Sequence, residues 1–316
     1  MKDNKNVAVV FPGQGSQRHG MGKDFCEQIP VCRQTYEEAA DALGWDVSAM
    51  CFGEDERLNL TEFTQPCIVT TEICMLRGLT KLYDFAPDYF GGHSLGEFTA
   101  LVAAGVMSLA ETLKIVQTRG KLMQEAVPIG VGGMAAVISE NIDIDMLEKA
   151  MQGLVADVAN INSTNQVVIS GELPALDETE KRLTQIFPAE KSFRFIRLNV
   201  SAPFHSRLMK SIENRFSDTL EKFGKNSDPR NAVHVTSNFT GGFHFNDISD
   251  IRKNLVNQLS HTVHWRKNMQ SLAEKTQEIY EVGPARPLRD FFRSIGVTCQ
   301  SITGLAAADK CFKVTN

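Results

Sequence analysis

The sequence predicts an α/β protein, with a core built on a mainly parallel sheet and a small ferredoxin-like subdomain inserted into it. Residues 7–11 form a short, continuously apolar run that is typical of a buried parallel strand. Residues 92–96 read Gly-His-Ser-Leu-Gly, a pattern in which a strand turns sharply into a helix. Residues 131–199 carry strand and helix patterns in the order β-α-β-β-α-β, which is that of a ferredoxin-like unit. We therefore expect a core of residues 1–130 and 200–316 and an inserted subdomain of residues 131–199.

Length and composition narrow the class of protein. With 316 residues, 42% of them hydrophobic, the chain can bury one large core. The formal net charge of −5 argues against a nucleic-acid binder, which needs a basic surface. The seven cysteines include no C-x-x-C pair, which predicts reduced thiols in a cytoplasmic protein. No apolar run approaches the roughly 20 residues of a membrane span, and no His, Cys and Asp group has ligand spacing, so we expect neither membrane insertion nor a metal site.

The first predicted strand, residues 7–11, runs into a loop that reads Pro-Gly-Gln-Gly-Ser-Gln at residues 12–17. Glycines on both sides of Gln14 let the main chain approach another group closely. A main-chain N–H of this loop is therefore a candidate donor for an oxyanion hole, in which the N–H of Leu95 would be the first donor. The alternative is an ordinary turn at the end of a strand.

Two amphipathic helices are expected before the Gly-His-Ser-Leu-Gly turn. Helical periodicity covers residues 23–43 and 64–83, and Thr64 is the expected N-cap of the second helix. Both helices are expected to pack over the core.

The turn at residues 92–96 lies between a predicted strand at residues 89–90 and a predicted helix over residues 95–107. Glycine is needed at both ends because a sharp strand-to-helix turn leaves no room for Cβ atoms. The turn presents the hydroxyl of Ser94 as a nucleophile, and the free amides and positive dipole of the following helix favour an anion beside it. The alternative is a glycine-rich turn with a solvated serine.

The next helix is expected to begin at a capping box formed by Ser108 and Glu111 and to run to about residue 126. Its periodicity places Arg119 on the inward side, away from the lysine-rich face. Breaking a buried charge pair typically costs ~3–5 kcal/mol, so an inward arginine needs an anion. Arg119 is either tied to an internal carboxylate or available to the carboxylate of a substrate, unless it is a solvated arginine at the boundary.

The rest of the chain supplies the subdomain and the second part of the core. After a glycine-rich hinge, the subdomain is expected to contain strands at 134–138, 155–161, 166–170 and 193–199 and helices at 144–151 and 175–186. The core is expected to resume with strands at 233–236 and 278–282 and helices at 207–223, 248–259 and 265–275. The last dozen residues are expected to be a loosely held tail.

A serine nucleophile needs a base to take its proton, and the seven histidines supply the candidates. His205 follows a predicted strand, is held by Pro203 and precedes a predicted helix, so it is the expected base. A histidine that follows the serine in the chain also suits an α/β-hydrolase-like sheet. His261 and His264 are the alternative pair.

Six short blocks together carry a resemblance to a known family. They are Phe11-Pro-Gly-Gln-Gly-Ser-Gln17, Gly92-His-Ser-Leu-Gly-Glu97, Gln117-Thr-Arg-Gly-Lys121, Asn162 with Gln166-Val-Val-Ile-Ser-Gly171, Pro203-Phe-His205 and Glu281-Val-Gly-Pro284. In this order, from about residue 7 to about residue 300, the sequence resembles the malonyl-CoA:acyl carrier protein transacylases and the acyltransferase domains of polyketide synthases. The resemblance implies a hydrolase-like α/β core with the ferredoxin-like subdomain inserted.

The resemblance also implies a reaction, in which a malonyl group passes from malonyl-CoA through an acyl-serine to the phosphopantetheine thiol of an acyl carrier protein. It makes Ser94 the nucleophile and His205 the general base, and it makes the N–H groups of Gln14 and Leu95 the oxyanion hole. Arg119 would then bind the malonyl carboxylate through two hydrogen bonds.

Three further positions take a role from the resemblance alone. The main-chain carbonyl of Gln258 would orient His205, Gln65 would line the acyl pocket, and Asn162 would lie near the path of the pantetheine arm. Phe204 resembles malonyl-selecting polyketide acyltransferases, because a ring beside the α-carbon crowds a methyl branch. The likeness is greatest to discrete, trans-acting polyketide synthase acyltransferases, so we expect a cytoplasmic monomer that uses malonyl-CoA as a substrate and binds no cofactor.

Two rival functions share this fold. An editing thioesterase would hydrolyse acyl groups from carrier proteins, but a hydrolase of neutral acyl chains has no use for an inward Arg119. A non-catalytic subunit that docks carrier proteins would not need both Ser94 and His205. Malonyl transfer is therefore the expected function.

Overall fold

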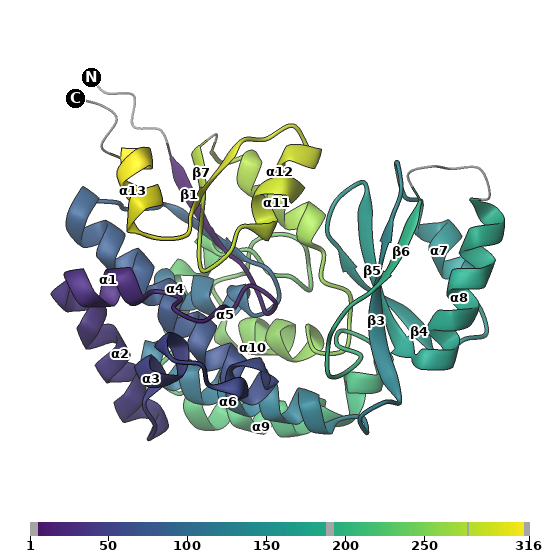
Figure 1. The fold of residues 1–316 in the computed structure, drawn as a ribbon, viewed down its shortest axis with the longest axis horizontal. Helices are drawn as coiled ribbons and strands as arrows, with labels where there is room; N and C mark the ends of the chain where they lie inside the picture. Colours follow the sequence, from purple (N-terminus) through teal and green to yellow (C-terminus); the bar gives the residue numbers. More distant parts are fainter. Residues whose placement is uncertain (1–5, 188–192, 277, 313–316) are drawn as a thin grey trace.

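The computed structural model describes residues 6–187, 193–276 and 278–312, and these residues form two four-stranded sheets (Figure 1). Sheet A has the strand order β2-β1-β7-β8 and is parallel throughout. Sheet B has the order β4-β5-β3-β6 and is antiparallel. The predicted α/β class, with a parallel core sheet and a second small sheet, is confirmed.

Sheet A is buried on both faces, which explains why its first strand is apolar throughout. Its strands are β1 (Val7–Phe11), β2 (Tyr89–Gly92), β7 (Glu278–Val282) and β8 (Cys299–Ile302). Side chains alternate across a strand, so Val9 and Phe11 belong to the large core cluster on one face. Ala8 and Val10 pack with Trp265 in a smaller cluster on the other face.

Helices cover the two faces of sheet A (Figure 1). The helices whose buried residues join the large cluster are α1 (Lys23–Gln28), α2 (Pro30–Leu43), α3 (Val47–Phe52), η1 (Glu56–Asn59), α4 (Thr61–Tyr83), α5 (Gly96–Ala103), α6 (Leu109–Glu125), η2 (Arg207–Ile212), α9 (Glu213–Phe223), η3 (Pro229–His234), α10 (Ile248–Asn257) and α13 (Leu305–Phe312). The opposite cluster is formed with α11 (Trp265–Ala273) and α12 (Pro287–Ser294). Within the described ranges, no helix combines the length and the apolar character needed to cross a bilayer.

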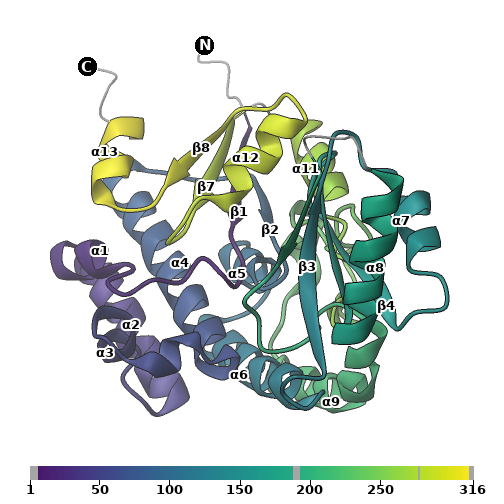
Figure 2. The same ribbon diagram turned by 45° about the vertical axis from the view of Figure 1, so that its right-hand side comes forward.

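Sheet B belongs to a unit with its own core, seen from two sides in Figures 1 and 2. Its elements are β3 (Gly132–Ile138), α7 (Ile144–Ala150), β4 (Ala156–Ile161), β5 (Gln166–Glu172), α8 (Leu173–Ile186) and β6 (Arg194–Arg197). Two main-chain hydrogen bonds join this unit to the rest of the chain, from Ile161 N to Val263 O (2.9 Å) and from Val263 N to Ala159 O (2.8 Å). The other face of sheet B, with Met134 and Val168, packs into the large core cluster.

The prediction of a strand at residues 233–236 is wrong. Residues 229–234 form the 3-10 helix η3 (Pro229–His234), and only single bridges follow, from Val235 to Phe90 and from Thr236 to Phe243. The physical reason is local: Pro229 occupies the first turn, and the Asp228 side chain accepts a hydrogen bond from Arg230 N (3.1 Å), which caps the turn.

Several observed helix boundaries differ from the predicted ones, two of them because of a nearby proline or glycine. The predicted helix over residues 23–43 breaks at Ile29, which is extended because Pro30 follows it. The helix after Ser94 ends at Ala103, since Gly105 adopts a φ of +74°. Thr64 is not an N-cap; α4 begins one turn earlier, and the Thr64 hydroxyl donates to Leu58 O at 2.6 Å.

Of the last dozen residues, 305–312 do not form a loose tail, and residues 313–316 lie outside the described residues. Residues 305–312 form α13 (Leu305–Phe312), which the sequence did not predict, just as it did not predict α12 and β8. The Phe312 ring stacks on Tyr83 at a centroid distance of 5.0 Å and on Tyr280 at 5.5 Å. The contact with Tyr83 joins residues more than 200 positions apart in the chain, and such a contact leaves no local sequence pattern.

Candidate active site

Ser94 occupies the turn between β2 and α5 with a φ of +53°, a left-handed conformation that is rare outside glycine. A Cβ atom at Gly92 would lie 2.0 Å from the carbonyl carbon of Gly96, and one at Gly96 would lie 2.2 Å from Phe11 O. Neither glycine can therefore be replaced without moving the main chain. The turn holds the serine hydroxyl at the carboxyl end of sheet A, where β1 and β2 both end.

His205 lies next to Ser94, with its Nε2 atom 2.7 Å from Ser94 Oγ. Its Nδ1 atom is 2.7 Å from the main-chain oxygen of Gln258. Because a carbonyl oxygen only accepts, Nδ1 carries the proton and Nε2 is free to accept from the serine hydroxyl. The pair can therefore act as nucleophile and base, with a main-chain carbonyl as the third member. The alternative candidate His261 instead contacts Asn257 O (2.9 Å) and does not line the cleft around Ser94.

Burial and the positive charge of Arg119 lower the pKa of His205 to about 3. The neutral, basic form therefore persists well below the usual histidine pKa of about 6.5. We expect kcat/KM for acylation of Ser94 to show no loss from His205 between about pH 8 and about pH 5. A pH profile of single-turnover acylation measures this, and a half-loss near pH 6.5 would contradict it.

The same profile has a control. Removing the Arg119 cation takes away one of the two main causes of the low pKa, so in Arg119→Ala the pKa of His205 rises toward its ordinary value. The acid loss of activity is then expected at a higher pH than in the wild type. The acyl donor in this comparison should carry no carboxylate, so that removal of the Arg119 cation does not also change how the donor binds.

Two main-chain N–H groups are suited to an oxyanion beside Ser94. Gln14 lies in the loop after β1, and Leu95 precedes the first turn of α5. In the described part of the chain, neither N–H donates to another group. The two loops touch closely, since a Cβ atom at Gly13 would lie 2.4 Å from His93 O. The side chain of Gln14 points elsewhere, with its amide donating to Thr61 Oγ1 at 3.1 Å.

Arg119 is buried, with 1% of its surface exposed, and points at the nucleophile. Its guanidinium donates to Gln65 Oε1 (3.0 Å), to Gln258 Oε1 (2.8 Å) and to Ser94 Oγ (3.3 Å). The guanidinium carbon lies 5.3 Å from the centre of the Phe98 ring. All of these partners are uncharged, so no carboxylate of the described residues forms a hydrogen bond with Arg119. Of the possibilities that the sequence left open, this geometry favours a substrate carboxylate.

Ser94 and its neighbours line a cleft of about 670 Å³, a volume suited to a small ligand. Among the residues expected at the site, those that line the cleft are Gln14, Gln65, Ser94, Arg119, Asn162, Phe204 and His205. Leu95 and Gln258 lie behind this surface and are fully buried. Sheet B contributes Met134 and Val168 to the opposite wall, and α12 contributes Phe291.

Asn162 reaches the cleft from the end of β4. Its Oδ1 atom is 2.8 Å from His93 Nε2, and its Nδ2 atom donates to Gln166 Oε1 at 2.9 Å. The first contact makes His93 Nε2 a donor, because an amide oxygen only accepts. Asn162 thereby links sheet B to the turn that holds Ser94.

Sequence reasoning did not identify Asn238, whose side chain forms hydrogen bonds with two main-chain groups of the turn that carries Ser94. Its Oδ1 atom accepts from Ser94 N (2.7 Å), and its Nδ2 atom donates to Gly92 O (2.7 Å). It also did not identify Glu97 and His244, which are buried together with Glu97 Oε1 2.8 Å from His244 Nε2. The one available signal was an acidic residue, Glu97, inside an otherwise apolar helix.

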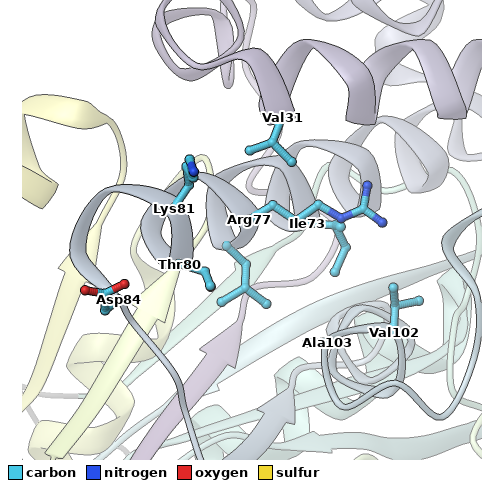
Figure 3. Close-up of a pocket in the computed structure, with 9 residues that line it drawn as sticks. Val31, Ile73, Arg77, Thr80, Lys81, Asp84, Val102 and Ala103 are labelled. Carbon is cyan, nitrogen blue, oxygen red and sulfur yellow. The ribbon is translucent and has the colours of Figure 1, made fainter.

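A second cavity, of about 590 Å³, lies between α4, α2 and α5 and is drawn in Figure 3. It contains no nucleophile paired with a base: its charged residues are Arg77, Lys81 and Asp84. Arg77 donates to Glu38 Oε2 at 2.7 Å and to Thr35 Oγ1 at 3.1 Å, so its charge is already paired. The cleft at Ser94 is therefore the candidate active site.

Comparison with known proteins agrees with this geometry. Residues 8–285 match the acyl transferase domain family. The malonyl CoA-acyl carrier protein transacylase of Escherichia coli K12 is 38% identical over 292 residues, which cover 91% of this chain and 92% of that relative. The Bacillus subtilis 168 protein of the same name is 34% identical over 304 residues, covering 94% and 92%.

Solved structures give the same result. The malonyl CoA-acyl carrier protein transacylase of Clostridium perfringens has a TM-score of 0.89 and 32% sequence identity, and the alignment covers 98% of this chain and 96% of that one. A malonyl-transacylase solved in complex with a type II polyketide synthase acyl carrier protein has a TM-score of 0.88 and 33% identity, with 98% and 99% covered.

Proposed function

This chain belongs to the acyl transferase family, among the malonyl-CoA:acyl carrier protein transacylases, and on that premise we propose that it transfers a malonyl group from malonyl-CoA to the phosphopantetheine thiol of an acyl carrier protein. One observation carries the proposal. A buried cation, Arg119, lies 3.3 Å from the oxygen of a serine that is hydrogen-bonded to a histidine. That arrangement suits an acyl group with a carboxylate at its far end.

In the first half-reaction, Ser94 attacks the thioester carbonyl while its proton moves to His205 Nε2. The main-chain oxygen of Gln258 accepts from Nδ1–H and so stabilises the imidazolium that forms. The negative oxygen of the tetrahedral intermediate would accept from the N–H groups of Gln14 and Leu95, where the loss of one donor typically costs ~10²–10³ in rate. His205 then protonates the departing coenzyme A thiolate, leaving malonyl-Ser94.

In the second half-reaction, the pantetheine thiol of the carrier protein replaces coenzyme A. It passes its proton to His205 and attacks the malonyl ester, and Ser94 leaves with that proton. The free enzyme is regenerated after two displacements, so the overall mechanism is ping-pong. The low pKa of His205 keeps Nε2 free to accept a proton at the start of each half-reaction.

Arg119 would bind the malonyl carboxylate, with Gln65 and Gln258 holding its guanidinium from two sides. Phe204, which is 7% exposed and lines the cleft, would crowd a methyl branch on the α-carbon. Asn162 lies on the sheet B side of the same cleft, where the pantetheine arm would pass.

The wider setting also forms part of the proposal. We expect a discrete enzyme that loads separate carrier proteins of polyketide or fatty-acid synthesis and that works as a monomer without a bound cofactor. Free cysteine thiols, six of them buried, suit a reducing compartment such as the cytoplasm.

Intact-protein mass after brief incubation with malonyl-CoA, acetyl-CoA or methylmalonyl-CoA tests the function. We expect a malonyl adduct that disappears when holo acyl carrier protein is added, with the malonyl group recovered on the carrier. Methylmalonyl loading measures how strictly the Phe204 ring excludes a branch. Preferential loading of neutral acyl groups, or release of malonate into water without transfer to the carrier, would replace this proposal with an editing thioesterase.

A further inference from the structure

Glu97 is a buried carboxylate behind the nucleophile to which the reaction above gives no role. It is the second residue of α5, and none of its side chain is exposed. Three polar groups converge on it: His244 Nε2 lies 2.8 Å from Oε1, while Asn238 N (3.0 Å) and Gln258 Nε2 (2.6 Å) donate to Oε2. A main-chain N–H and an amide NH2 group can only donate, so Oε2 accepts from both Asn238 and Gln258.

The contact with Gln258 sets which way that side-chain amide faces. Its Nε2 atom donates to Glu97 Oε2 and to Ser94 O (3.0 Å), which leaves Oε1 pointing at Arg119, 2.8 Å from Nη2. A reversed amide would place its NH2 group against the guanidinium, two donors face to face. The Glu97 carboxylate thus determines that the oxygen of the Gln258 amide, and not its NH2 group, faces Arg119.

The charge of Glu97 also acts on the buried Arg119 cation. The hydrogen-bond partners of Arg119 are all neutral, and burial lowers its pKa to about 10 while the charge of Glu97 acts in the opposite direction. The other oxygen of Glu97 faces His244. Because one amide separates Glu97 from Arg119, the carboxylate offsets the buried cation without occupying the donors that a substrate carboxylate needs.

We propose that Glu97 is a positioning residue for acyl-group selection: by orienting the Gln258 amide, its carboxylate holds the Arg119 guanidinium in the geometry that receives a malonyl carboxylate. This inference rests on the proposed function, since it assigns Arg119 to that carboxylate. It adds Glu97, which lies behind the cleft in the helix that follows the nucleophile, to the residues that select the acyl group.

Glu97→Gln is the first variant to make, because glutamine keeps the size but turns one acceptor oxygen into a donor. We expect kcat/KM for Ser94 acylation by malonyl-CoA to fall about tenfold or more, mainly through KM, with a much smaller change for acetyl-CoA. The malonyl-to-acetyl ratio therefore falls. Glu97→Asp keeps the charge on a shorter side chain and is expected to restore part of the ratio.

Glu72→Gln is the matched control. Glu72 is as deeply buried, and its carboxylate accepts from Thr99 Oγ1 at 2.5 Å in α5, but it contacts neither Gln258 nor Arg119. The ratio is expected to stay at the wild-type value in this variant, even if its melting temperature falls. A loss of selectivity in Glu97→Gln is then not a general effect of a buried Glu→Gln change.

A double-mutant cycle with Gln258→Met tests the route of the effect. Methionine removes the side-chain relay but keeps the main-chain oxygen that holds His205. If Glu97 acts through Gln258, Gln258→Met lowers the ratio by a similar factor, and adding Glu97→Gln lowers it little further. If Glu97→Gln fails to fold, Glu97→Asp and the Gln258→Met variant still measure the ratio.

Two outcomes would overturn the inference: an unchanged malonyl-to-acetyl ratio in Glu97→Gln, whether both activities fall equally or neither falls, and full additivity in the cycle. Failure of the proposed function looks different, because the wild-type protein itself would then form no malonyl adduct. The two results are therefore distinguishable in one set of measurements.

Discussion

Ser94→Ala is expected to form no acyl-enzyme with malonyl-CoA and to lose transfer to the carrier protein by a factor of about 10⁴ or more. The hydroxyl is the atom that forms the ester, and no other nucleophile lies within hydrogen-bond distance of His205 Nε2 in the described part of the chain. Alanine keeps the Cβ atom that already tolerates the φ of +53° at this position, so the fold is expected to survive.

Intact-protein mass and a transfer assay to holo carrier protein measure the effect. Ser170→Ala is a matched control, because Ser170 is fully buried in β5 and its hydroxyl has no hydrogen-bond partner among the described residues. That variant is expected to acylate like the wild type. An adduct of normal size on Ser94→Ala would show that another residue carries the acyl group, and the assignment of the nucleophile would fall.

Arg119→Ala is expected to lower kcat/KM for malonyl-CoA by roughly a hundredfold to a thousandfold, while acetyl-CoA is affected far less. A malonyl carboxylate in this buried position would lose its charged partner and would have only the amides of Gln65 and Gln258 beside it. Acetyl groups have no carboxylate, so the preference for malonyl-CoA over acetyl-CoA, measured as the ratio of their kcat/KM values, is expected to decrease or reverse.

Arg119→Lys separates charge from geometry. Lysine keeps a cation but lacks the planar fork that can bind both carboxylate oxygens and contact two glutamines at once. Its malonyl activity is therefore expected to lie between those of the wild type and Arg119→Ala. Parallel losses for malonyl-CoA and acetyl-CoA in both variants would mean that Arg119 supports the site structurally and does not select the acyl group.

Sequence patterns predicted the elements whose formation depends on residues within one short segment. The apolar run at residues 7–11 is the strand β1, since a strand buried on both faces is typically apolar throughout. The run at residues 278–282 is the strand β7, although it contains Glu278 and Glu281. The capping box at Ser108 begins α6, and helical periodicity placed Arg119 inside the protein. Glycine and proline residues determined where several helices begin or end, including the break at Ile29.

Some elements were missed because their stability comes from distant contacts. Residues 305–312 have little local signal, yet they form α13, which the rings of Tyr83 and Tyr280 hold in place. The strand expected at residues 233–236 is the opposite case. The cap formed by Asp228 and Pro229 begins a 3-10 helix that includes Val233 and His234, which are half of the expected strand.

The sequence by itself determined the fold class, the turn that presents Ser94 and the inward position of Arg119, because each depends on spacing within one short segment. Only the tertiary structure decided how these parts meet. His205 reaches Ser94 across 111 positions of the chain, and Gln258 and Asn238 reach Glu97 across 161 and 141. Such hydrogen bonds depend on the docking of distant loops and helices, and a single polar residue at each end leaves no periodicity from which to predict them.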